Sequence, residues 1–316
     1  MTSIILNLIA RGLGVSGGVF LSIVVARLAG PDGLGAFAVF LGLLGALGIV
    51  ARLGLDTALI RAVAWAEGRA AAGAPVALLR RAGGRVILPA LLFGALGSAL
   101  LASGWLGRPF PGTVALMPLL LPLLTVLALV AGYAKGRSRA WLAPVFEIGG
   151  ISLLAALGLA VLALLAPPSE AAVTGAFLAA LVVLGLAALA MIRHDMPRPP
   201  RLPALSTDQA ADLRRGQVDF TLIALATFLT QAGVFVLAAP FLTEADLGLL
   251  RAAERLALLV SFPVLAINPV IAPHIVRLAR GHDGAGLRRL TGRAMLASGG
   301  IGLPVLLVLL IWPERA

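Results

Sequence analysis

The sequence of 316 residues has no cysteine, only three histidines and few charged side chains. Without cysteine there is no disulfide framework and no thiolate that reacts or binds a metal. The histidines (His194, His274 and His282) have no ligand-like spacing, so we predict no metal site and no cofactor. Charged residues make up 12% of the chain, against roughly 25% in a soluble domain, which excludes a water-soluble enzyme.

Apolar residues make up 60% of the chain, and the mean hydropathy is +1.04. Eight runs of 19 to 26 residues carry no formal charge, and about 20 helical residues cross a bilayer core. An earlier stretch, which contains Asn7 and Arg11 and ends in a Gly-Pro turn, adds a ninth span. We therefore predict an all-α, polytopic helical membrane protein. Its expected spans are 4–28, 34–53, 85–107, 112–134, 142–165, 171–192, 218–241, 247–270 and 293–312.

The net charge of +11 has a source other than nucleic-acid binding, which we do not expect. Of the 25 basic residues, 19 lie on one side of the predicted spans, and cytoplasmic loops of membrane proteins are rich in Lys and Arg. This asymmetry predicts an inner-membrane protein with a cytoplasmic N-terminus and, after nine spans, a periplasmic C-terminal end.

Residues 193–216 interrupt the spans. They begin with a basic, proline-rich stretch that cannot be helical and continue with a capping-box pattern, Ser206 to Gln209. We expect an N-terminal lobe of six helices (1–192), a cytoplasmic linker with an amphipathic helix (193–216), and an incomplete C-terminal lobe of three helices (217–316).

A weak internal repeat agrees with this division. Gly33-Leu34-Gly35 opens the second span and Asp246-Leu247-Gly248 opens the eighth, 213 residues later. The same offset carries span one onto span seven. Repeats of equal orientation are related by an axis along the membrane normal, and transporters built in this way bind their substrate between the lobes. The alternative is a chance alignment of two spans rich in Leu, Ala and Gly.

Two segments, 26–64 and 244–294, carry motifs of moderate specificity. The first has an Arg, a Gly-Pro-acid turn and then the string Arg52, Gly54, Asp56, Ala58 and Arg61. The second has an acid-x-Gly turn, an Ala-rich helix, a proline-containing exit and a basic amphipathic stretch. With these motifs the chain resembles the polysaccharide (oligosaccharide) flippase family of the multidrug/oligosaccharidyl-lipid/polysaccharide exporter superfamily. The resemblance implies alternating-access transport of a polyprenyl-pyrophosphate-linked oligosaccharide for polysaccharide biosynthesis.

The span count departs from that family, whose members carry twelve or fourteen spans where this chain has nine. We expect either that the chain is a fragment or that another chain supplies the remaining helices.

Arginines within the spans are the candidate substrate ligands. A charge in hydrocarbon costs at least about 2.5–3.5 kcal/mol on insertion scales, and arginine presents a fork that matches phosphate oxygens. Arg11, Arg52 and Arg255 are the predicted pyrophosphate ligands, with Arg251 as a weaker candidate. The alternatives are that Arg52 pairs with Asp56 four residues later and that Arg251 extends to the membrane interface.

Carboxylates near the spans are candidates for coupling to a proton or cation. Asp56 and Glu254 stand beside arginines and are more simply explained as their counter-ions. Glu147 has no partner nearby in the sequence, so it is the first candidate for a coupling site.

Other functions stay open at this point. A multidrug or cation antiporter of the same superfamily would need an acidic cavity, and a non-transporting assembly subunit fits the low span count. A membrane enzyme acting on a polyprenyl substrate would need a large outer loop or an Asp-rich metal cluster, and the sequence has neither. The expected partners are a lipid-linked oligosaccharide, membrane lipids and polysaccharide assembly proteins.

Overall fold

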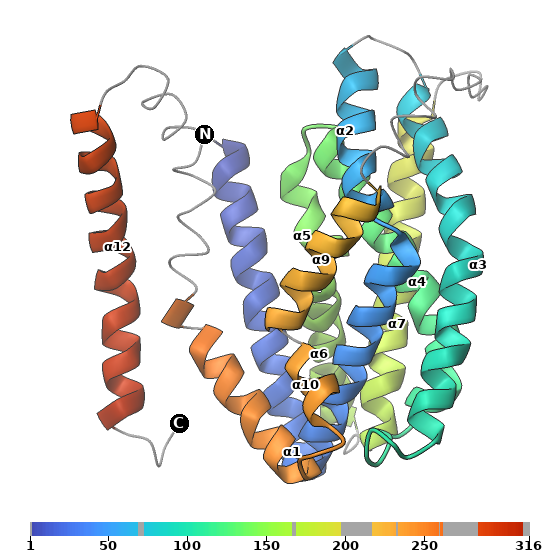
Figure 1. The fold of residues 1–316 in the computed structure, drawn as a ribbon, viewed down its shortest axis with the longest axis vertical. Coiled ribbons are helices and arrows are strands. Elements are labelled where there is room, and N and C mark those ends of the chain that lie inside the picture. The colour runs from blue at the N-terminus through green and yellow to red at the C-terminus, as the bar shows by residue number, and fades with distance from the viewer. Residues whose placement is uncertain are drawn as a thin grey trace.

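The computed structural model describes residues 2–68, 73–165, 169–196, 217–231, 233–258, 260–261 and 284–311 (Figure 1). These residues form helices and no strand, which confirms the predicted all-α class. Five of the described helices are long and apolar enough to cross a membrane, so the chain is a multi-pass membrane protein.

Helix α1 (Thr2–Arg52) consists of two arms that meet at Gly30. Gly30 has φ 69° and ψ −171°, a conformation that is essentially restricted to glycine. Pro31 follows and has no amide hydrogen to continue the ladder of the first arm. The predicted turn between spans one and two is therefore confirmed, and the two arms bring the crossings up to residue 195 to the predicted six.

The connection predicted between residues 53 and 85 is largely helical. Helix α2 (Leu55–Gly68) follows a sharp bend at Leu53 and Gly54, and α3 (Ala74–Ala102) begins eleven residues before the predicted span at 85. The charged residues Arg80, Arg81 and Arg85 thus lie on a helix and not in a loop. Hydropathy marks where a chain enters the membrane, whereas this helix begins at the Gly73-Ala74-Pro75 turn outside the apolar run.

Helix α4 (Thr113–Gly136) is one span, but the predicted span 142–165 is not a single helix. A short turn η1 (Ala140–Leu142) leads into α5 (Ala143–Phe146), and α6 (Ile148–Leu165) begins only after Glu147. Glu147 is extended, with ψ 169°, so the helix is broken at this carboxylate.

Helix α7 (Glu170–Asp195) ends three residues later than predicted, so Arg193, His194 and Asp195 belong to it and not to the linker. The linker itself, with its predicted amphipathic helix, falls at 197–216, outside the described residues.

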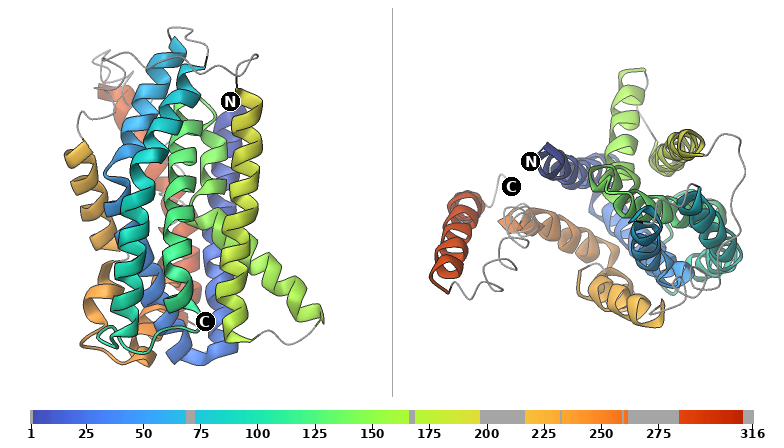
Figure 2. Two further views of the ribbon diagram at one scale, coloured as in Figure 1. Left: turned by 90° about the vertical axis from the view of Figure 1, so that its right-hand side faces the viewer. Right: turned by 90° about the horizontal axis from the view of Figure 1, so that it is seen from above.

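The second part of the chain contains α9 (Gln217–Gln231), α10 (Gly233–Ala238), a helix over 244–258, and α12 (Gly284–Ile311). The first three lie beside α1, whereas α12 stands apart from α1 to α10 (Figures 1 and 2). It comes close to residue 260, since an added Cβ at Gly302 would lie 2.8 Å from the carbonyl oxygen of Val260. The predicted eighth span is described only as far as 261. The division into two lobes stays a prediction.

The hydrophobic core lies among α1, α3, α4, α6 and α7. Fully buried side chains such as Leu44, Val86, Leu129 and Phe177 fill it. Apolar side chains on the outer faces of the same helices, such as Leu92 and Leu186, are more than half exposed. A bundle that is apolar inside and outside is stable only where its surface contacts lipid.

Candidate functional site

A cavity of about 740 Å³ lies between the second arm of α1 and the helix over 244–258. Helices α2, α4 and α9 and the break at Glu147 complete its wall. Apolar residues such as Leu41, Ile49, Leu124 and Phe228 form much of the lining. Seven charged side chains join them: Arg52, Asp56, Lys135, Glu147, Arg251, Glu254 and Arg255.

Six of these seven are candidates selected from the sequence, so the fold brings residues from distant spans to one cavity. The seventh sequence candidate, Arg11, lies on the first arm of α1, and its side chain is outside the described part of the structure. Lys135 was not among the candidates.

Arg52 and Asp56 form the predicted i, i+4 pair, with 3.2 Å between Arg52 Nε and Asp56 Oδ2. The bend at Leu53 and Gly54 separates the two residues, so the pair joins the end of α1 to the start of α2. Both also line the cavity. The pairing is therefore confirmed, and it leaves the guanidinium at the cavity wall.

Glu147 has a partner after all, which corrects the expectation that it stands alone. Its Oε1 accepts a hydrogen bond of 2.7 Å from Nζ of Lys135, in the last turn of α4. The two residues are twelve apart in sequence, and the turn through η1 and α5 brings them together. From the sequence, Lys135 was used only as one of the basic residues that assign the cytoplasmic side of the membrane.

Arg251 is buried, so the expectation that it extends to the membrane interface is wrong. Its Nη1 lies 2.7 Å from Oε2 of Glu254, one turn further along the same helix. Its guanidinium carbon lies 5.0 Å from the centre of the Phe235 ring in α10, within the range of a cation–π contact. The Arg251 guanidinium thus contacts the Glu254 carboxylate and the Phe235 ring.

Arg255 makes weaker contacts than Arg251. Its Nε lies 3.9 Å from the same Glu254 oxygen, too far for a hydrogen bond, and within the described ranges the Nε atoms of both Arg251 and Arg255 have no hydrogen-bond partner. The side chain is 15% exposed, and its guanidinium lies against Gly18 of the first arm of α1. One carboxylate thus serves two arginines, and the lining residues comprise four cations and three carboxylates. The surplus positive charge falls at the pair of Arg251 and Arg255.

The pair of Lys135 and Glu147 should be easily separated. Its side chains are 32% and 37% exposed, and pairs with this much access to water contribute about 0–1 kcal/mol. We expect a coupling free energy below about 1 kcal/mol in a thermal-unfolding double-mutant cycle with Lys135→Met and Glu147→Gln. A coupling energy of several kcal/mol would show that the pair is a structural clamp.

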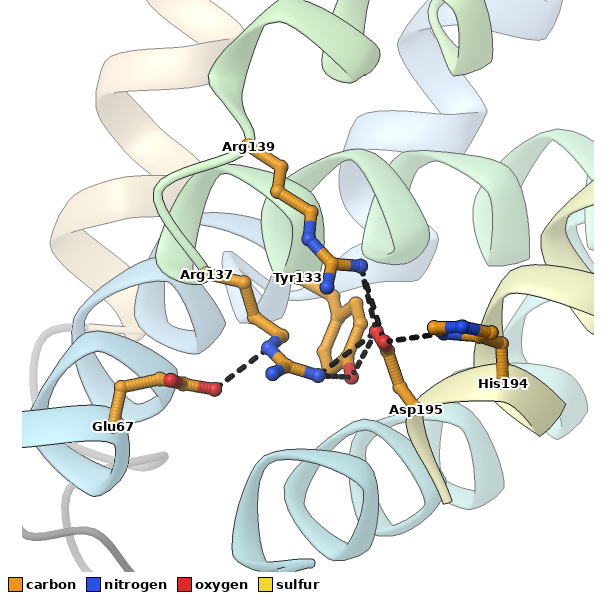
Figure 3. A network of polar contacts seen from close by, with 6 residues as sticks. All are labelled: Glu67, Tyr133, Arg137, Arg139, His194 and Asp195. Carbon is orange, nitrogen blue, oxygen red and sulfur yellow. Dashed lines mark hydrogen bonds and ion pairs between the residues drawn. The ribbon is translucent and has the colours of Figure 1, made fainter.

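A second polar cluster lies away from the cavity, at the end of the bundle where α2, α4 and α7 meet (Figure 3). Its centre is Asp195, whose side chain is 2% exposed. Arg137 Nη1 lies 2.9 Å from Asp195 Oδ2, Arg139 Nη1 lies 3.1 Å from Oδ1, and the Tyr133 hydroxyl donates to Oδ2 over 3.0 Å.

Arg137 extends this cluster to α2, with 2.6 Å between its Nε and Oε1 of Glu67. Burial lowers the pKa of the Arg137 guanidinium, but the Tyr133 hydrogen bond and the charges of Asp195 and Glu67 outweigh it and raise the pKa. Arg137 therefore stays charged. Sequence reasoning missed the cluster because it assigned Asp195 to the linker and the two arginines to a loop.

Long apolar helices that share a cavity with a charged lining define the class of this protein, a multi-pass membrane protein. The family described as polysaccharide biosynthesis protein matches residues 3–279, and the chain belongs to that family. This confirms the resemblance found in the sequence. Comparisons with curated proteins and with solved structures gave no match.

Proposed function

We propose that this protein moves an oligosaccharide linked to a polyprenyl pyrophosphate across the bacterial inner membrane by alternating access, for polysaccharide biosynthesis. The observation that carries the proposal is Arg255, a largely sheltered guanidinium at the cavity wall that shares the Glu254 carboxylate with Arg251. The protein acts as a transporter and not as an enzyme, since no bond of the cargo is broken.

The chemistry of the cargo matches the cavity. A pyrophosphate cannot leave water for hydrocarbon without compensating charge, and a guanidinium supplies a permanent charge and two parallel donors. The apolar lining, such as Leu41 and Ile49, suits the first isoprene units. A cavity that is both cationic and apolar fits a lipid-linked anion better than a free sugar.

The charged residues divide into three roles under this proposal. Arg255 binds the phosphate directly, and Arg52 and Lys135 join it by exchanging Asp56 and Glu147 for phosphate oxygens. Arg251 holds Glu254 by the shorter contact and so leaves the Arg255 guanidinium available to the cargo. Glu147, once Lys135 has turned to the cargo, loses its counter-ion and takes up the coupling proton or cation. Arg11 remains a sequence-based candidate for the same phosphate.

A multidrug or cation antiporter is less well supported. Such a cavity needs a carboxylate free to bind an organic cation, whereas Asp56, Glu147 and Glu254 each lie within 3.2 Å of a basic side chain. No observation in the described residues favours this second function.

Binding measurements with the protein in lipid nanodiscs test the proposal. A polyprenyl pyrophosphate should bind at least about tenfold more tightly than the polyprenol of the same length, because each charge-assisted contact contributes about 1.5–3 kcal/mol. High salt should reduce this difference in affinity between the two lipids. Equal affinity for the two lipids, or tighter binding of a lipophilic cation than of either, would contradict the proposal.

A further inference from the structure

The two halves of the chain touch backbone to backbone at the end of the bundle that carries the Gly30 turn (Figure 1). At Gly35, an added Cβ would overlap the carbonyl oxygen of Glu244 and lie 2.9 Å from the amide nitrogen of Gly248. At Gly248, an added Cβ would overlap the carbonyl oxygen of Pro31. Neither position has room for a side chain, since real Cβ atoms essentially never come within 3.0 Å of such atoms.

These contacts are reciprocal under the repeat found in the sequence. An offset of 213 residues carries Gly35 onto Gly248 and Pro31 onto Glu244. Gly35 lies against Glu244, and Gly248 lies against Pro31. The two contacts are therefore equivalent, because each joins a glycine of one half to the residue four positions before the glycine of the other half. This is the pattern of a self-complementary interface across a two-fold axis. A chance alignment of two apolar spans does not predict it.

Neighbouring residues strengthen the same contact. Leu34 and its repeat equivalent Leu247 are 4% and 1% exposed. The Glu244 carboxylate accepts a hydrogen bond of 2.8 Å from the backbone amide of Arg108, in the loop between α3 and α4. Three segments that are distant in the sequence thus meet at this end of the bundle.

The cavity begins directly beyond this contact. On the helix over 244–258, its first lining residue is Arg251, three residues or about 4.5 Å past Gly248. On the second arm of α1, the first is Leu41, six residues or about 9 Å past Gly35. The glycine contact therefore separates the cavity from the nearer end of the bundle.

We propose that Gly35 and Gly248 form a two-fold gate, which seals the cavity at this end and must part for cargo to leave there. On the predicted topology this is the periplasmic end. Because the contact is backbone against backbone, it closes without side-chain interlocking and opens when the two helices separate by a few ångströms. The gate concerns access alone and does not depend on which cargo the cavity binds.

The chain has no cysteine, so single reporter cysteines test the gate directly. Ala257→Cys places a thiol on the cavity wall, and Arg108→Cys places one at the exposed loop beside the gate. In membrane vesicles of both orientations, a membrane-impermeant maleimide should label these two thiols from opposite faces. Labelling of both from the same face in the unaltered gate would overturn the proposal.

Gly35→Ala and Gly248→Ala should each prevent closure. The Ala257→Cys thiol should then react from the Arg108 face at least about tenfold faster than with both glycines present. Since either side chain holds the whole interface apart, the double variant should add little to either single one. Gly175→Ala is the matched control, because a Cβ at Gly175 in α7 meets no atom within 4 Å.

Two results would contradict the gate: unchanged labelling in both glycine variants, or an effect at only one of the two glycines. If the glycine variants fail to fold, a cross-linking measurement replaces them. Arg108→Cys and Glu244→Cys should be joined in high yield by a short bifunctional methanethiosulfonate, and absence of this product would overturn the proposal. None of these readouts needs the glycan, so failure of the gate and failure of the proposed cargo are distinguishable.

Discussion

Replacing Arg255 by alanine is expected to abolish surface display of the glycan in cells that depend on this protein, at a normal protein level. Loss of one charge-assisted contact of about 1.5–3 kcal/mol weakens pyrophosphate binding by about ten- to a hundredfold. The protein should still fold, because Glu254 keeps its shorter contact with Arg251. The measurements are glycan display and the membrane level of the protein.

Arg255→Lys should fall between the wild type and Arg255→Ala, because lysine keeps the charge but loses the planar fork. Arg80→Ala is the control, since Arg80 is an exposed arginine of α3 that is not among the residues lining the cavity. Normal display with Arg255→Ala and Arg11→Ala combined would refute the pyrophosphate assignment. Those arginines would then be structural partners of Glu254 and of lipid headgroups.

Asp195→Ala is expected to lower the stability of the protein strongly. The change leaves Arg137, Arg139 and the fully buried Tyr133 without their shared acceptor. Removing one partner of a buried charge network costs about 3–5 kcal/mol. In detergent, the melting temperature should fall by about 10 °C, measured as the loss of monodisperse protein after heating.

Glu67→Gln is the matched control for this prediction. Glu67 pairs with Arg137 in the same cluster, but its side chain is 39% exposed, so the expected cost is below about 1 kcal/mol. Equal melting temperatures for Asp195→Ala and the wild type would show that water already satisfies the two arginines. The cluster would then not hold α2, α4 and α7 together.

Much of the architecture was predictable because the bilayer acts on the sequence residue by residue. Uncharged runs long enough to cross it had to become helices, and Gly30 followed by Pro31 had to be a turn. The intramembrane charges were equally conspicuous, since a charge in hydrocarbon is costly unless it has a role. For this reason six of the seven selected charged residues line one cavity.

Pairing was predictable only between residues three or four positions apart in the sequence. The contacts of Arg52 with Asp56 and of Arg251 with Glu254 follow from helical spacing, and the structure contains both. The contact of Lys135 with Glu147 was missed because it depends on a helix break at 147, which hydropathy does not indicate. The Asp195 cluster was missed for a similar reason, since its members come from three helices whose ends extend beyond the apolar runs.

The sequence by itself therefore determined the class of protein, the number of spans up to residue 195, the turn at Gly30 and the charged residues that a membrane protein must shelter. Only the tertiary structure decided which of those charges meet. It also decided that Arg251 and Arg255 share one carboxylate, and that Gly35 and Gly248 each lie against the backbone of the other half of the chain. The physical reason is the distance along the chain over which each effect acts. Hydropathy and helical spacing act over one span, whereas a cavity and a two-fold contact arise from packing between helices about 200 residues apart in the chain.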